Sequence, residues 1–209
     1  MAKQVHDVLP AAPNADEQGV SFHDYHRTII AYHGTTADVA EQLVDGEPFK
    51  ASDNDDDWFG KGIYFWEYAP KQAWWWASKF KKKEHPAVVG AIIRLGQCLD
   101  LLDPINVATI KAFHDDTISK WETAEVEIPE NGNQHKKLDC AIFNLFYDQS
   151  DAAIETARAV YVPTQSAKRA WKRSWIYEEA HIQICVREPK NILAVWRVRK
   201  DGRYGRDAD

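Results

Sequence analysis

Two stretches decide the expected fold of this chain, Tyr32-His33-Gly34-Thr35-Thr36 and Phe59-Gly60-Lys61-Gly62-Ile63-Tyr64-Phe65, which follows about one helix later. The apolar, β-branched run 28–32 predicts a buried strand that delivers His33, at its carboxyl end, to a cleft. The spacing of 35–38 is typical of a helix capping box, and Gly46 predicts the end of that helix. Taken alone, His33 fits a core histidine beside a simple turn equally well.

The second stretch places a tyrosine inside a glycine-flanked strand. It lacks the third glycine of a dinucleotide fingerprint and the Gly-Lys-Ser/Thr ending of a P-loop, so neither motif is predicted. The glycines instead predict a bend that points Tyr64 into the cleft, where its ring can stack on a planar heterocycle. A tyrosine that packs on the core is the alternative. The acidic run 53–57 lacks the glycine and glutamate of a calcium loop, and we interpret it as a solvated rim.

The order His-Gly-Thr, helix, Gly-x-Gly-x-Tyr-Phe resembles the first two motifs of the ADP-ribosyltransferase superfamily, in the type shared by poly(ADP-ribose) polymerases and diphtheria toxin. The signature of that family is a histidine, a tyrosine and a glutamate on three separate strands. The resemblance covers roughly residues 28–198. It implies an α+β fold with a split, mostly antiparallel β-sheet and inserted helices.

The resemblance also implies NAD⁺ as co-substrate and assigns residues to it. His33 would hold the adenosine ribose, the backbone of Gly34 the nicotinamide amide, and Tyr64 the face of the nicotinamide ring. Thr35 and Gly62 complete the NAD⁺ contacts that the two motifs imply.

The third motif departs from the family pattern. Aligning the strand 180–187 on its apolar run puts Gln183 where the catalytic glutamate stands, with His181 two residues earlier on the same face. Glutamine can hold a ribose hydroxyl but carries no negative charge and cannot act as a base. Three alternatives stay open: a nucleophile that needs little activation, a contribution from Glu178 or Glu179, or binding without catalysis.

Hydrophobic periodicity divides the remaining chain into helices and strands. Helices are expected at about 69–83, 107–121 and 138–146, and strands at 87–95, from 98, at 159–162 and at 192–198. We expect a mobile N-terminal arm at 1–24, one catalytic domain at 25–200 and a polar tail at 201–209.

Composition favours a cytoplasmic protein with one domain. The 209 residues are 44% hydrophobic, enough for one sizeable core, and show no transmembrane run or secretory signal. Three widely spaced cysteines predict neither a disulfide framework nor a zinc site, and the histidines have no metal spacing. No membrane partner and no metal are expected.

Positive charge is concentrated near the C-terminus. Residues 158–206 carry twelve Lys/Arg against four Asp/Glu, although the whole chain has a net charge of −6. A basic stretch with interleaved tryptophan precedes the third motif and suits a phosphate backbone with a stacked base. Its candidate acceptor-binding residues are Lys168, Arg169, Trp171, Lys172, Arg173 and Trp175, together with His181. The alternative is a solvated loop whose tryptophans clamp it to the core.

The resemblance implies an NAD⁺-dependent mono-ADP-ribosyltransferase, and the basic stretch predicts single-stranded RNA or DNA as its acceptor. Resemblance and context point to an intracellular bacterial toxin or phage-defence effector that an antitoxin protein would restrain. A protein-modifying transferase and an NAD⁺ glycohydrolase are the alternative enzymes. A catalytically silent module that binds NAD⁺ or nucleic acid is the non-enzymatic alternative, because position 183 is a glutamine.

Overall fold

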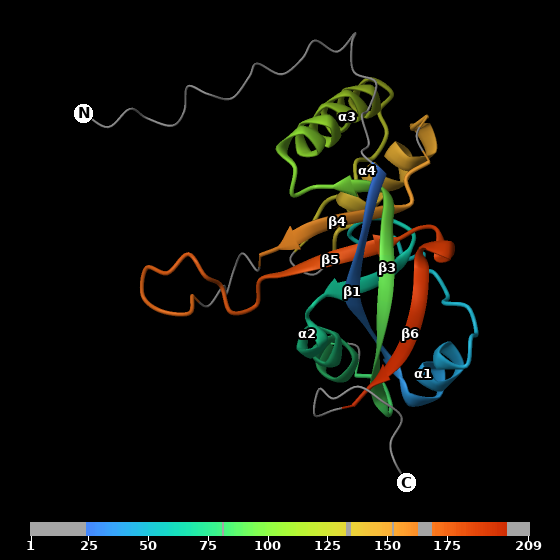
Figure 1. Ribbon diagram of the computed structural model, residues 1–209. Helices are drawn as coiled ribbons and strands as arrows, with labels where there is room; N and C mark the ends of the chain where they lie inside the picture. Colours follow the sequence, from blue (N-terminus) through green and yellow to red (C-terminus); the bar gives the residue numbers. More distant parts are fainter. Residues whose placement is uncertain (1–23, 81, 133–134, 152, 163–168, 200–209) are drawn as a thin grey trace.

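The computed structural model describes residues 24–80, 82–132, 135–151, 153–162 and 169–199. The predicted tail and all of the predicted arm except Asp24 lie outside these residues. Helices lie toward the two ends of a mixed, mostly antiparallel six-stranded sheet, so the α+β class is as predicted (Figure 1). The strands are β1 (Asp24–Thr36), β2 (Ile63–Glu67), β3 (Pro86–Asp100), β4 (Thr156–Tyr161), β5 (His181–Val186) and β6 (Ile192–Val198).

The strands follow the order β1-β2-β5-β4-β3-β6, and β1 also pairs with β3. Among the described strand pairs, only β3 and β4 run parallel. The pairing of β1 with β2 is short, because its register joins only Ala31 to Glu67 and Tyr32 to Trp66. Beyond Tyr32, β1 continues beside β3, whereas the first residues of β2 lie beside β5. The strands that carry His33 and Tyr64 are thus paired at one end only.

The first helix forms where the capping signal predicts it. Helix α1 (Ala37–Val44) begins after Thr36, whose hydroxyl accepts a hydrogen bond from the backbone N–H of Val39 at 3.4 Å. Its apolar face buries Ala40 and Leu43 against β3. The strand before it is longer than predicted, because β1 runs on to Thr36. His33 therefore lies within the strand rather than after its end.

The helix expected at 69–83 is interrupted. Helix α2 (Pro70–Trp75) continues directly into a π-helical turn, Trp76–Phe80. Ala73 and Ala77 are fully buried, and the carbonyl oxygen of Ala73 would lie 2.4 Å from a Cβ added at Gly34. The small residues let α2 approach β1 more closely than larger side chains would allow.

The two later helices are present and longer than predicted. Helix α3 (Pro104–Thr123) starts at Asp103, whose carboxylate accepts from the backbone N–H of Ile105 at 2.9 Å. Helix α4 (Lys137–Gln149) packs Phe143 and Phe146 against β4 and β5. A short 3₁₀ turn, Pro189–Asn191, precedes β6.

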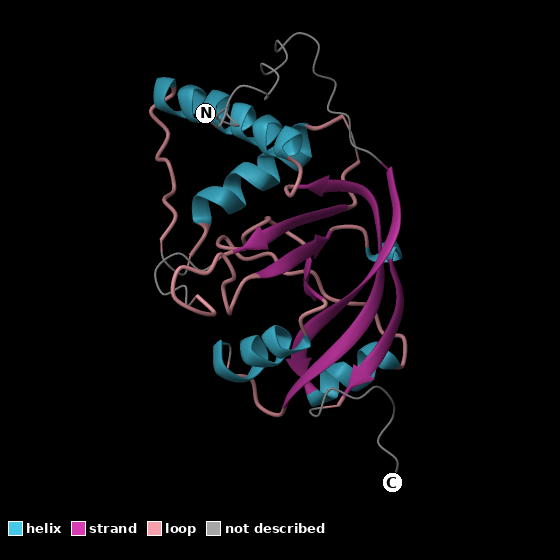
Figure 2. Cartoon of the chain, turned by 60° about the vertical axis from the view of Figure 1, so that its left-hand side comes forward, coloured by secondary structure: helices cyan, strands magenta, loops and turns pink. Residues whose placement is uncertain are grey.

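The core lies on both sides of the sheet. One side is filled by alternate residues of β1, β2, β3 and β5, among them Ile29, Phe65, Ile93 and Ile184. The other side of β5 and β4 packs on α4, while α2 packs near Trp66. Figure 2 shows α3 and α4 toward one end of the molecule and α2 toward the other, with strands between them.

A buried network of ion pairs connects three strands. Arg158 of β4 donates from Nε and Nη2 to the carboxylate of Glu67 on β2, at 2.9 and 3.1 Å, and from Nη1 to Asp100 on β3, at 2.7 Å. All three residues are buried. Burial lowers the pKa of Arg158, but the hydrogen bonds and charges of the two carboxylates outweigh it and raise the pKa. The sequence patterns did not predict this network.

Candidate functional site

His33 is a half-buried residue that joins β1 to β2 through its side chain. Its Nδ1 lies 2.8 Å from the backbone carbonyl oxygen of Tyr64, just beyond the last residue pair of the two strands. A carbonyl oxygen can only accept, so Nδ1 carries the proton and the lone pair is on Nε2. Burial lowers the pKa of His33, which keeps the ring neutral at pH 7. The ring centroid lies 5.5 Å from those of Phe49 and Phe65.

Tyr64 fixes the turn that precedes its own strand. Its hydroxyl donates to the carbonyl oxygen of Gly60 at 2.6 Å and accepts from the backbone N–H of Phe59 at 2.9 Å. Burial raises the pKa of Tyr64 well above its ordinary value, so the hydroxyl stays protonated. The ring lies nearly parallel to that of Phe59, at 6.3 Å and 12°. This half-buried ring also packs on the core, as the alternative interpretation of Tyr64 predicts.

The rings of His33 and Tyr64 lie on opposite sides of β2. His33 contacts Phe65, and successive side chains of a strand point to opposite faces. Gln183 of β5 lies on the Tyr64 side, since its neighbours Ile182 and Ile184 pack into the core on the other side. The structure brings the three predicted residues onto adjacent strands, but it does not gather the three side chains on one face.

Three predicted NAD⁺ contacts are engaged in packing within the protein. A Cβ added at Gly62 would lie 2.2 Å from Sγ of Cys185, and both backbone polar groups of Gly62 bond to Ser52, at 2.8 and 3.1 Å. Gly34 accommodates the backbone of α2, as described above. Thr35 is buried beside the cap of α1.

Gln183 lies among polar and aromatic groups that sequence reasoning did not single out. In the sheet register it stands opposite Trp66 of β2 on one side and Ala159 of β4 on the other. Its Nε2 lies 3.2 Å from Nε2 of His181, which shares its face as predicted. The ring of His181 stacks on Tyr161 of β4, at 5.0 Å and 28°. Side chains alternate between the two faces of a strand, and this alternation along β2 and β4 could have identified Trp66 and Tyr161 from the sequence.

The two alternative carboxylates, Glu178 and Glu179, are exposed and lie just before β5. The backbone carbonyl oxygen of Glu179 accepts from Nδ1 of His181 at 2.7 Å and from Nε2 of Gln72 on α2 at 3.4 Å. These contacts hold the start of β5 beside α2. The Glu179 side chain keeps its carboxylate near His181, where its charge raises the pKa of the ring and so opposes the effect of burial.

The basic stretch forms a small hairpin that projects from the body of the molecule, in orange at the left of Figure 1. Arg169 pairs with Tyr177, and its guanidinium lies 5.8 Å from the ring of Trp175 and 5.1 Å from that of Tyr177. Trp171 is 61% exposed and Trp175 87% exposed, so these tryptophans do not clamp the loop to the core.

The other described basic residues of the hairpin, Lys172 and Arg173, are exposed. Both lie at its tip, where Arg173 adopts a left-handed φ of 65°. Lys168 lies outside the described residues. Exposed indoles beside exposed cationic groups offer both of the contacts that a single-stranded nucleic acid uses, stacking and phosphate neutralisation.

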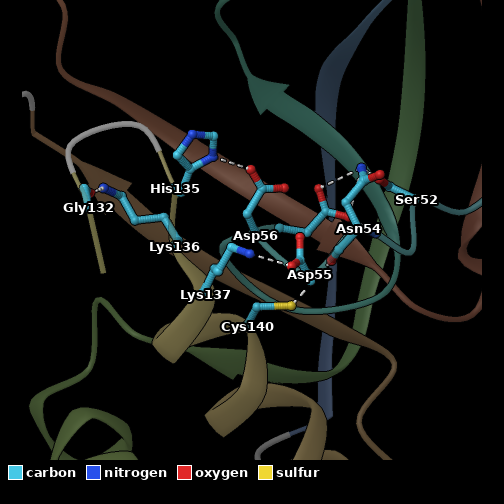
Figure 3. A network of polar contacts seen from close by, with 10 residues as sticks. Ser52, Asn54, Asp55, Asp56, Gly132, His135, Lys136, Lys137 and Cys140 are labelled. Atoms are coloured by element: carbon cyan, nitrogen blue, oxygen red, sulfur yellow. Dashed lines mark hydrogen bonds and ion pairs between the residues drawn. The ribbon is translucent and has the colours of Figure 1, made fainter. Parts of the chain in front are cut away.

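The acidic run is held against α4 and is not only a solvated rim, as Figure 3 shows. Asp55 pairs with Lys137 at 2.6 Å and Asp56 with His135 at 2.7 Å, while Sγ of Cys140 donates to the carbonyl oxygen of Asn54 at 3.3 Å. The sequence holds no local sign of these contacts, because the partners are some 80 residues apart. They fix the loop that leads to Gly60 and Tyr64.

No family model, curated protein or solved structure matches this chain. Within the described ranges, no helix is long and apolar enough to cross a membrane, and no cluster of His, Cys, Asp or Glu could hold a metal ion. Cys98, Cys140 and Cys185 are buried free thiols.

Proposed function

We propose that this chain is an NAD⁺-dependent mono-ADP-ribosyltransferase that modifies single-stranded nucleic acid. The observation that carries the proposal is the placement of His33, Tyr64 and Gln183 on β1, β2 and β5, which are neighbours in the sheet in that order. The short pairing of β1 with β2 supports it further, because beyond Tyr32 and Trp66 the main chains of the two strands no longer pair with each other, and the proposal places NAD⁺ at this point.

The available hydrogen-bonding groups fit the two riboses of NAD⁺. The neutral ring of His33 keeps an acceptor at Nε2, which suits a hydroxyl of the adenosine ribose. Gln183 supplies a carboxamide acceptor for a hydroxyl of the nicotinamide ribose, and the half-buried ring of Tyr64 supplies an aromatic face. Gly34 would offer its backbone to the nicotinamide amide.

The missing carboxylate favours a nucleophile that needs no general base. A base nitrogen of the acceptor attacks C1′ of the nicotinamide ribose, and the bond from C1′ to nicotinamide breaks with release of neutral nicotinamide. Any proton on the attacking nitrogen passes to solvent. A hydroxyl acceptor would need a base at position 183, which glutamine cannot provide.

The hairpin 169–177 is the proposed acceptor surface. Its exposed Trp171 and Trp175 can each stack on a base, and Lys172 and Arg173 can neutralise phosphates. The affinity for nucleic acid should fall steeply as the salt concentration rises, because counterions return to the phosphates when the nucleic acid dissociates. We further propose that the protein acts as a toxin or phage-defence effector, with an antitoxin as its partner.

Purified protein incubated with labelled NAD⁺ and separate pools of RNA, DNA and protein tests this proposal. Label should appear on single-stranded nucleic acid, and Gln183→Ala should abolish transfer without unfolding the chain. Lys172→Glu with Arg173→Glu should depress transfer while NAD⁺ binding stays nearly unchanged. Lys111→Glu with Lys120→Glu, on exposed positions of α3, makes the same change of net charge and serves as the control.

Each other outcome identifies an alternative. Label on protein alone favours the protein-modifying transferase, and free ADP-ribose alone favours the glycohydrolase. NAD⁺ binding without any turnover favours the silent module, which the neutral side chain of Gln183 also favours. If NAD⁺ does not bind, or binds equally to His33→Ala and Tyr64→Ala, the assigned site is wrong.

A further inference from the structure

His181 is held from three directions. Its Nδ1 lies 2.7 Å from the carbonyl oxygen of Glu179, its ring stacks on Tyr161, and its Nε2 lies 3.2 Å from Nε2 of Gln183. Both ring nitrogens therefore have partners inside the protein. The expected contact of His181 with the acceptor stays a prediction.

The chemistry of these partners determines where each proton lies. A carbonyl oxygen cannot donate, so Nδ1 of His181 carries the proton that bonds to Glu179. In a neutral ring, Nε2 then has only a lone pair and must accept. The one group of Gln183 that can donate to it is the amide NH₂. The orientation of the carboxamide thus follows from the hydrogen bonds themselves and not from its shape, which is nearly the same in both orientations.

We propose that His181 is a positioning residue that holds the amide nitrogen of Gln183 and so turns the Gln183 oxygen toward the bound substrate. The role of that oxygen, accepting from the nicotinamide-ribose hydroxyl, rests on the proposed function. The orientation itself does not. Without His181, the carboxamide could turn over and present NH₂, a donor, to a hydroxyl whose proton needs an acceptor.

The arrangement makes the orientation of Gln183 depend on pH. Protonated His181 has a donor at both nitrogens, so Gln183 must turn its oxygen to Nε2 and its NH₂ outward. Among the described residues, the titratable groups that face the ring are the phenol of Tyr161 from β4 and the carboxylate of Glu179. Helix α2 contributes the uncharged side chain of Gln72, which shares the Glu179 carbonyl oxygen.

Nuclear magnetic resonance of the ¹⁵N-labelled full chain tests the orientation without NAD⁺. At neutral pH, His181 should show the Nδ1–H tautomer. The side-chain amide signals of Gln183 can be assigned by their absence in Gln183→Met. On acidification, these signals should shift with the same midpoint pH as the imidazole signals of His181. Tyr161→Phe keeps the stacked ring and should preserve this coupling. An Nε2–H tautomer, or Gln183 signals that ignore the titration of His181, would overturn the proposal.

Kinetics then tests the consequence for transfer. His181→Phe keeps the ring and removes both nitrogens, and we expect kcat to fall about tenfold, the value of one hydrogen bond, with a smaller change in KM for NAD⁺. His181→Gln can still accept a hydrogen bond from Gln183, so it should recover much of the wild-type kcat. Because glutamine does not titrate, the kcat of this variant should not decline at acid pH. Equal losses in both variants with an unchanged pH profile would contradict the positioning role. If the resonance results hold but no transfer occurs, only the proposed function fails.

Discussion

The imidazole of His33 bonds to the backbone carbonyl oxygen of Tyr64 at 2.8 Å, where the pairing of β1 with β2 has ended. At this point the side chain of His33 supplies a hydrogen bond between the two strands in place of one that their main chains no longer make. His33 therefore stabilises the fold in addition to its proposed contact with NAD⁺. Experiments on His33 have to measure stability and binding separately.

The stability of the protein should fall on mild acidification. Burial lowers the pKa of His33 and His181 below the ordinary 6.5, so the unfolded chain takes up these protons first as pH falls. Their contribution to the free energy of unfolding is complete above about pH 6.5 and is lost as pH falls through the lowered pKa. Tm measured by circular dichroism between about pH 7.5 and pH 5 should decline less steeply in His33→Gln. The carboxamide can donate to Tyr64 without titrating.

His114→Gln is the matched control, because the side chain of His114 on α3 is 39% exposed. Its Tm profile should follow that of the wild type. Parallel profiles for His33→Gln and the wild type would mean that His33 is already accessible to protons in the folded chain.

Removing the hydroxyl of Tyr64 should destabilise the turn before β2 while keeping the aromatic ring. Tyr64→Phe leaves the N–H of Phe59 and the carbonyl of Gly60 without their partner, at a cost of about 1–3 kcal/mol. In a domain of this size, each kcal/mol lowers Tm by roughly 2–4 °C. Titration calorimetry should find NAD⁺ affinity retained, unlike in Tyr64→Ala. Tyr68→Phe, at a site 62% exposed, should leave Tm unchanged.

Adding a methyl group at Gly62 should force β2 away from β5. Its Cβ would lie 2.2 Å from Sγ of Cys185, so Gly62→Ala is expected to cost about 1–3 kcal/mol of unfolding free energy in urea denaturation. In a Cys185→Ala background the further cost should be smaller, because the obstructing sulfur is gone. Gly132→Ala, where the nearest atom is 4.0 Å away, is the control. If the costs of Gly62→Ala and Cys185→Ala are strictly additive, the contact with the sulfur of Cys185 is not the cause of the destabilisation.

Breaking the buried network of ion pairs should be costly. Arg158→Met leaves the buried carboxylate of Asp100 without its cation, and among the described residues it leaves Glu67 with only the exposed Arg27, at 3.8 Å. We expect a loss of about 3–5 kcal/mol in urea denaturation. Adding Glu67→Gln removes one of the two buried negative charges and should recover part of that loss. Lys120→Ala breaks only an exposed pair with Asp116, so its effect should stay below about 1 kcal/mol.

Local signals in the sequence were enough to locate most elements of the fold. The capping-box spacing of 35–38 predicts α1, and the apolar runs predict β5 and β6 within a few residues. The two strands expected at 87–95 and from 98 are instead one continuous strand, β3. The expected end of β1 before His33 was wrong, because pairing with β3 continues to Thr36 and the sequence does not show that partner. The π-helical turn after Trp75 likewise reflects tertiary packing rather than local propensity.

The sequence indicated that the candidate residues lie on strands, but not how their side chains are arranged. Alternation along β5 correctly placed His181 and Gln183 on one face. It could not show that the rings of His33 and Tyr64 point to opposite sides of β2, since that depends on cross-strand register. The docking of Asp55 on Lys137 joins residues that lie far apart in the sequence, and only the folded structure reveals it.

The sheet order also determines when the protein can become complete during its synthesis. β1 and β3 can pair once Asp100 has left the ribosome, but β2 keeps an unpaired edge until β5 follows it. Such an edge is a site for wrong pairing or chaperone binding while translation continues. β5 is the strand that joins β2 to β4, and it is also the strand that carries Gln183. A nascent chain released before Val186 would therefore lack a complete β5, and with it the pairing that joins β2 to β4.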